Sequence, residues 1–114
     1  MPSESRLHDH RTTTLDANGF GSVNFGPSRP NTKYIITGVG VQVSSNTLVP
    51  TAKVYRGTAQ PSNFISGTYD GSSDADNALN EELWPGEIIT VTWESGDVGA
   101  TATANFRGQE ITGV

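Results

Sequence analysis

The two histidines of the chain lie close together near its start, at His8 and His10, with Asp9 between them. Imidazole and carboxylate groups bind zinc, but ligands at i and i+2 alone lack the converging partners of a closed site. Nucleophilic catalysis needs a serine or threonine beside a histidine that a third group orients, and no such motif surrounds these histidines. We therefore expect no metal site, no cofactor and no catalytic residues.

Acidic residues are the next candidates for chemistry. Asp70, Asp74 and Asp76, with Asn77, form an oxygen-rich stretch of the kind that calcium prefers. Their spacing matches no EF-hand loop, and aspartate, serine and glycine are also the usual residues of a solvated turn. The sequence leaves calcium binding by this stretch open.

Three glutamates, Glu81, Glu82 and Glu87, are of the type that hydrolyses glycosidic bonds in pairs, but their spacing defines no cleft. The chain also contains no nucleophile elbow, no P-loop and no dinucleotide-binding motif. We expect that it is not an enzyme.

Binding is the alternative to catalysis. The net charge of −5 argues against nucleic acid as a partner, because phosphate binding depends on clustered Lys and Arg. Basic side chains do occur within the first thirty positions, where they favour local contact with an acidic partner. The candidate partner-binding residues are Arg6, His8, His10, Arg11 and Arg29.

Exposed aromatic rings would suit a sugar ligand, which stacks on them. Trp84, next to Pro85, is the ring we expect to be partly exposed, and Tyr69 is the second stacking candidate. Trp93 is expected in the core.

These side chains must be positioned by a small domain. A chain of 114 residues has room for one hydrophobic core, and without cysteine that core cannot be reinforced by disulfides. The polar composition of residues 1–11 predicts an extended N-terminal arm, followed by a single domain over 12–114. No segment has the run of apolar residues needed to span a bilayer, so we expect no membrane partner.

Short alternating apolar runs separated by turns predict an all-β fold, a two-sheet antiparallel β-sandwich of jelly-roll or Greek-key type. The expected strands cover residues 12–16, 22–25, 33–44, 50–57, 63–69, 87–94 and 100–108. Asn18-Gly19 predicts a hairpin between the first two strands, and the last two are also expected to pair as a hairpin.

Alternation predicts which side chains face the core. In the strand 33–44 these are the odd-numbered residues, including Ile35 and Val39, with Gly38 and Gly40 on the other face marking a bend or a close approach. In the strand 87–94 they are Ile89, Val91 and Trp93. The residues 84–87, Trp-Pro-Gly-Glu, predict a type II turn between the segments.

The stretch 83–93, Leu-Trp-Pro-Gly-Glu-Ile-Ile-Thr-Val-Thr-Trp, followed by Gly-Ala-Thr-Ala-Thr-Ala at 99–104, resembles small virion proteins of tailed actinobacteriophages. Tyr-Arg-Gly at 55–57 and Pro-Ser-Asn at 61–63 extend the resemblance, which covers roughly residues 32–110. It implies a capsid decoration or cement protein, or a tail or neck component. No catalytic residue is carried over.

From the resemblance and the composition we expect a virion structural protein on the capsid exterior. Its partners would be the major capsid protein, which it would stabilise, and neighbouring copies of itself in a homotrimer. The alternative is a tail-associated carbohydrate-binding or host-recognition module that uses Trp84 and Tyr69.

Overall fold

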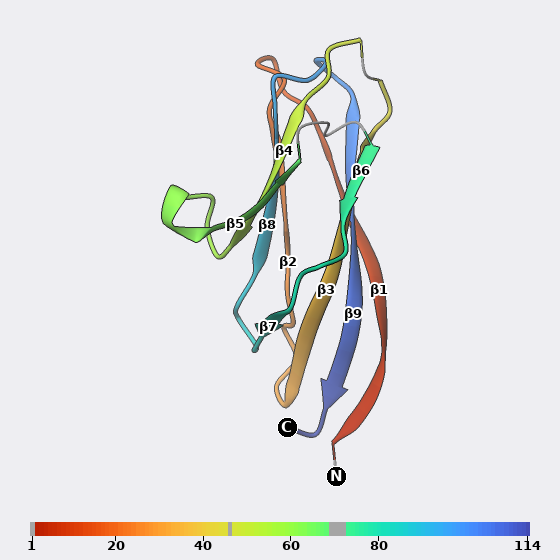
Figure 1. Ribbon diagram of the computed structural model, residues 1–114, viewed down its shortest axis with the longest axis vertical. Coiled ribbons are helices and arrows are strands. Elements are labelled where there is room, and N and C mark those ends of the chain that lie inside the picture. Colours follow the sequence, from red (N-terminus) through yellow and green to blue (C-terminus); the bar gives the residue numbers. More distant parts are fainter. Residues whose placement is uncertain (1, 46, 69–72) are drawn as a thin grey trace.

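The computed structural model describes residues 2–45, 47–68 and 73–114. Its elements are β1 (Ser3–Thr14), β2 (Gly21–Phe25), β3 (Thr32–Val43), β4 (Thr51–Arg56), a 3-10 turn η1 (Pro61–Asn63), β5 (Phe64–Thr68), β6 (Ser73–Asp76), β7 (Glu81–Leu83), β8 (Ile89–Glu94) and β9 (Thr101–Thr112). The molecule measures 50 × 25 × 22 Å, and both termini lie at the same end (Figure 1).

The strands form two antiparallel sheets that pack face to face (Figure 1). Sheet A has the order β1-β9-β3-β6, and β7 pairs with another part of β3. Sheet B has the order β2-β8-β4-β5. With β6 and β7 sharing one position, this is the strand order of a jelly roll. The expected two-sheet antiparallel β-sandwich of jelly-roll type is confirmed.

Both expected hairpins are wrong. β1 belongs to sheet A and β2 to sheet B, and β8 and β9 are likewise in different sheets. The turn at Asn18-Gly19 does form, with Gly19 at φ 71°, but it carries the chain across the sandwich. Beside it, the N–H of Gly96 in the β8–β9 turn donates to the carbonyl of Gly19 at 3.0 Å. The two connections therefore support each other at one end of the molecule.

The segment expected to be an N-terminal arm lies in a sheet, within the described residues. β1 pairs with β9 along its whole length, from Ser3 opposite Thr112 to Thr14 opposite Thr101. Its Leu7 belongs to the core and is 7% exposed. An edge strand can carry polar side chains on its outer face and at its rim, which is why its composition resembles that of an arm. The boundary expected between residues 11 and 12 thus falls inside a strand.

The residues of β3 that face the core are even-numbered in its first part and odd-numbered in its second part. The register with β9 shifts between Ile36 and Gly38, so that one extra residue, Thr37, is accommodated in a bulge. Before the bulge Ile36 is buried, and after it Val39 and Val41 are. The expectation that Ile35 faces the core is therefore wrong, because a single inserted residue reverses the alternation. Ile35 lies instead on the outer face of sheet A.

The core between the sheets is formed mainly by β8 and β9. Ile89, Val91 and Trp93 are fully buried, as the alternation predicts, and so is Phe106 of β9. Phe106 stacks on Phe25 of β2 with ring centroids 4.4 Å apart. The predicted turn at 84–87 is also confirmed, since the N–H of Glu87 donates to the carbonyl of Trp84 and Gly86 has φ 89°.

Candidate functional site

The outer face of sheet A brings together polar side chains from strands that are distant in sequence. In the β1–β9 ladder Arg6 is opposite Gln109, His8 is opposite Arg107 and His10 is opposite Asn105. Directly opposite residues in an antiparallel pair point to the same side of the sheet. Three of the five candidate partner-binding residues, Arg6, His8 and His10, therefore share one exposed surface.

This surface is hollowed into a groove of about 710 Å³, which we call the sheet A groove. Ile35 is an apolar residue of its lining, and Gly108, which has no side chain, contributes backbone. Its lining comes from β1, β3, β9 and the segment before β7, and consists of Arg6, Leu7, His8, Ile35, Thr37, Asn80, Arg107, Gly108 and Gln109.

Glycines in the sheet shape this groove. A Cβ on Gly108 would overlap the carbonyl oxygen of Ile35, so only glycine allows β9 to approach the bulged strand here. A Cβ on Gly38 would lie 2.7 Å from Oδ1 of Asn77, the atom that accepts a hydrogen bond from Arg107 at 2.7 Å. Gly38 therefore leaves space for this contact, which holds the Arg107 side chain over β3 with its guanidinium on Asn77.

The two arginines of the sheet A groove differ from the other cations. The chain has seven Lys and Arg residues, and five of them lie within 4.0 Å of a carboxylate: Arg11, Arg29, Lys33, Lys53 and Arg56. Arg6 and Arg107 have no such carboxylate partner within residues 2–45, 47–68 and 73–114. The arrangement leaves two guanidinium groups available to an anionic ligand on the same face.

The other two candidate partner-binding residues lie elsewhere. Arg11 is on the opposite side of β1 from His10, where it pairs with Asp9 at 3.1 Å and lies 4.9 Å from the ring centroid of Phe25. Arg29, in the β2–β3 connection, pairs with Glu110 at 2.6 Å. Both cations are thus occupied within the chain and are separate from the sheet A groove.

Strand geometry also separates the members of the His8-Asp9-His10 triplet. Alternation puts both imidazoles on the outer face and Asp9 on the other, where the His10 N–H and the Arg11 guanidinium lower the pKa of its carboxyl group. The triplet does not converge on one point. No group of three or more His, Cys, Asp or Glu side chains in the described part of the chain is arranged to hold a metal ion.

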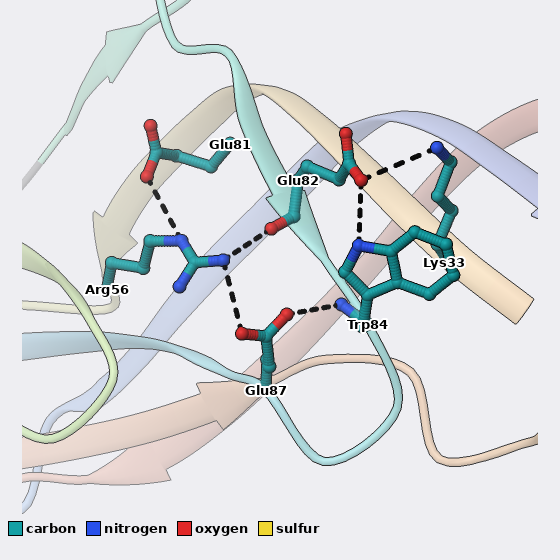
Figure 2. Close-up of polar contacts among 6 residues, drawn as sticks. All are labelled: Lys33, Arg56, Glu81, Glu82, Trp84 and Glu87. Carbon is teal, nitrogen blue, oxygen red and sulfur yellow. Dashed lines mark hydrogen bonds and ion pairs between the residues drawn. The ribbon is translucent and has the colours of Figure 1, made fainter.

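A second polar cluster surrounds Trp84 (Figure 2). The Trp84 backbone N–H donates to Glu87 and its indole N–H donates to Glu82, both at 2.7 Å, while Lys33 Nζ lies 5.0 Å from the ring centroid. Trp84 remains 43% exposed, in agreement with the expectation of partial exposure. The indole is consequently an exposed ring held in one orientation.

Arg56 connects the carboxylates of this cluster (Figure 2). It donates to the carbonyl oxygen of Glu82 at 2.6 Å and pairs with Glu81 and Glu87 at 3.5 Å. The Trp84 N–H, followed by Arg56, lowers the pKa of Glu87. A general acid in glycoside hydrolysis needs a raised pKa, so this environment does not suit Glu87 to that role.

The acidic stretch at 70–77 is partly a strand. Asp74 and Asp76 lie in β6, opposite Val41 and Val39 of β3. Asp76 accepts hydrogen bonds from the Ser66 hydroxyl at 2.5 Å and the Ala78 N–H at 2.9 Å, and these two contacts lower its pKa. Asp70, like the stacking candidate Tyr69, lies outside the described residues.

The helical content of the described ranges is the single turn η1, and no helix there has the length and apolarity to cross a membrane.

Sequence reasoning did not identify Arg107, Gln109, Asn80 or Thr37 as parts of a site. Alternation does place Arg107 on the outward face of its strand, which is the signal available from the sequence. The pairing of β1 with β9, about one hundred positions apart, is what joins it to Arg6 and His8.

No model of a known protein family matches the chain, and no curated protein matches it. Among solved structures, a chain from work on Bacillus endospore appendages, described as disulfide-linked pili, aligns with 100% of this chain and 91% of that chain, at 10% identity and TM-score 0.47. A chain of infectious bursal disease virus Gx strain aligns with 97% of this chain at 10% identity and TM-score 0.36. A family two carbohydrate esterase from Cellvibrio japonicus aligns with 100% at 13% identity and TM-score 0.32.

This chain spans about a third of the viral and esterase chains, 31% and 35% of their lengths. At these TM-scores the likenesses do not bear on function, and the fold assignment rests on the strand pairing described above.

Proposed function

We propose that this chain is a structural protein of a phage virion, a capsid decoration protein that binds the major capsid protein through the outer face of sheet A and thereby stabilises the shell. The resemblance in residues 83–104 suggests the virion. The observation that carries the binding surface is the pair of guanidinium groups, Arg6 and Arg107, without a carboxylate partner among the described residues of an acidic chain.

The absence of a catalytic role is part of the same proposal. His8 lies opposite Arg107 and His10 opposite Asn105, so neither imidazole is paired across the ladder with a serine or threonine nucleophile. A protein that acts by attachment needs instead a rigid surface with groups left free for its partner. The two-sheet core and the ladder beneath the sheet A groove meet this need.

The test is co-sedimentation of the purified chain with empty phage heads. We expect saturable binding that weakens as salt is raised, because the contacts between exposed charges are screened. Arg6→Gln and Arg107→Gln should each reduce binding, whereas Lys53→Gln, which removes the same charge from sheet B, should not. Absence of saturable binding by the unmodified chain would overturn the proposal.

Neighbouring copies are the second proposed partner, in a homotrimer on the capsid exterior. Large apolar side chains are exposed on three connections at the end of the molecule opposite the termini (Figure 1): Phe20, Leu48, Val49 and Val98. Exposed apolar groups gathered at one place favour association with another protein. We assign this apolar end to contacts between copies.

A tail-associated carbohydrate-binding module is the second candidate function, and the immobilised, 43% exposed indole of Trp84 favours it. A rigid ring loses little conformational entropy when a sugar stacks on it. Trp84→Ala should abolish binding to host envelope glycans if this function is the right one, and leave head binding unchanged if the chain decorates the capsid.

A further inference from the structure

The outer face of sheet A also indicates the chemistry of its ligand. Arg6 is directly opposite Gln109, two residues along β9 from Arg107. Diagonal neighbours of this kind lie roughly 7–8 Å apart on the same face of the sheet, with their Cβ atoms slightly closer.

The two guanidinium groups are held differently. Arg107 donates one N–H to Asn77 Oδ1 at 2.7 Å, which orients its plane and leaves its other donors available. The Arg6 guanidinium makes no hydrogen bond or ion pair with the described residues, and the residue is exposed. A carboxylate matches the two parallel donors of a guanidinium, so each arginine can take one carboxylate in a bidentate contact.

Negative charges near the groove limit the length of an anionic ligand. Glu4 lies on the same face of β1, two residues from Arg6, and the chain as a whole carries −5. A long polyanion such as nucleic acid would meet repulsion beyond the two arginines. A short acidic segment would not.

Neutral polar side chains in the groove are suited to hydrogen bonds with a peptide backbone. Gln109, Asn80 and Thr37 contribute amide and hydroxyl groups to the lining, and these can both donate to and accept from a peptide backbone. A volume of about 710 Å³ is enough for a few residues of extended chain.

An extended peptide rises about 3.4 Å per residue, and its side chains alternate between two sides. Carboxylates at positions i and i+2 therefore point to one side about 7 Å apart, a separation similar to that of the two arginine positions on the sheet, from which the flexible side chains reach their ligands. Adjacent carboxylates point to opposite sides and do not match it.

We propose that the sheet A groove binds an extended acidic segment of a partner protein in which two carboxylates are separated by one residue, with one carboxylate on Arg6 and the other on Arg107. The inference rests on the proposed function for the identity of the partner, which is the capsid surface. The chemistry of the ligand follows from the groove itself.

The experiment titrates the full chain with blocked five-residue peptides at about 0.05 M salt, where charges are weakly screened, and follows the backbone amides by NMR. Thr-Glu-Thr-Glu-Thr should shift the amides of Gly108 and Gln109. Thr-Gln-Thr-Gln-Thr should bind roughly tenfold more weakly or worse, because charged hydrogen bonds are lost. Thr-Glu-Glu-Thr-Thr, with the same charge, should be several-fold weaker than the spaced peptide.

Variants of the chain locate the contact. Arg6→Gln with Arg107→Gln should eliminate the shifts, and the matched variant Lys53→Gln should retain them. Arg6→Lys with Arg107→Lys preserves charge and solubility but loses the bidentate fork, so intermediate affinity is expected. The amide spectrum and thermal midpoint of each variant check that it is folded.

Equal affinity for the spaced glutamate and glutamine peptides would overturn the inference, as would shifts confined to another face or unaltered binding by the double glutamine variant. Head binding separates the two proposals. If heads bind the chain and the spaced peptide does not, the ligand assignment is wrong and the decoration role stands. If the peptide binds in the groove and heads do not, the decoration role is wrong.

Discussion

Single residues determine how closely the strands approach and how the connections between them are held. Gly108 is the clearest example, because a Cβ there would overlap the carbonyl oxygen of Ile35 next to the bulge in β3. Asp97 is another, since it accepts hydrogen bonds from the Ser45 hydroxyl and the Thr47 and Leu48 N–H groups. One residue permits a close approach, and the other holds two connections together.

Gly108→Ala should lower the free energy of unfolding by roughly 3 kcal/mol, because the added methyl group forces two paired strands apart. Gly40→Ala is the control. Its Cβ would lie 3.8 Å from the nearest atom, at ordinary contact distance, and it should change stability little. Urea denaturation of the two variants measures the difference, and equal stability would contradict the close packing described here.

Asp97 makes stability depend on acid pH. The Ser45 hydroxyl, with the N–H groups of Leu48 and Thr47, lowers the pKa of Asp97 below the ordinary 3.8. A lowered pKa in the folded state contributes stability above the ordinary value, and that contribution is lost as the pH falls through the folded value. Asp97→Asn should therefore reduce the thermal midpoint at neutral pH.

The same variant should show a smaller drop in thermal midpoint between about pH 5 and pH 3 than the unmodified chain. Calorimetry at the two pH values provides the comparison. An unchanged drop would mean that other acidic groups, such as Asp76 with its hydrogen bond from Ser66, dominate the acid sensitivity.

Among the strands, β1 has the composition of a polar arm but is a fully paired member of sheet A. Eleven of its twelve residues are not buried hydrophobics, yet every one is paired with β9. It also supplies Arg6, His8 and His10 to the outer face of sheet A. β1 is thus both structural and a contributor to the proposed binding surface.

Removal of residues 1–11 should destabilise the whole domain rather than release a functional core. The truncated chain would lose most of β1, including buried Leu7, and would expose the edge of β9, which favours aggregation. We expect aggregation or loss of the cooperative thermal transition, measured by light scattering and circular dichroism. A stable, monodisperse product starting at Thr12 would contradict the integration of β1, and point substitutions are the better test of binding.

Across the molecule as a whole, the end opposite the termini and the outer face of sheet A have different chemistry. The end opposite the termini exposes Leu48 at 57% and Val98 at 68%, while the face of sheet A exposes guanidinium groups. Such separation allows one surface to contact copies and another to contact the shell.

Leu48→Ser combined with Val98→Ser should weaken self-association, measured by sedimentation velocity over a range of concentrations, because apolar area leaves the interface. Phe64→Ser removes an exposed apolar side chain, 48% exposed, at a different place and is the matched control. If the double variant associates as the unmodified chain does, the apolar end is not the contact between copies.

Local sequence patterns were enough to predict the fold class, most strand positions, the inward set Ile89, Val91 and Trp93, and the turn at 84–87. These depend on local alternation and on the φ preferences of proline and glycine, which neighbouring residues specify. The sequence also indicated that Arg6, His8 and His10 belong to a binding surface, a prediction that stays untested.

Which strands pair could be seen only in the folded chain. A turn such as Asn18-Gly19 serves a hairpin and a crossing between sheets equally well, so both hairpin predictions failed. The extra residue Thr37 reversed the facing of Ile35 because a bulge is recognised only against the partner strand β9. The sheet A groove joins Arg6 to Arg107 through pairing between the two ends of the chain, and such long-range pairing is set by the packing of the whole sandwich rather than by local sequence.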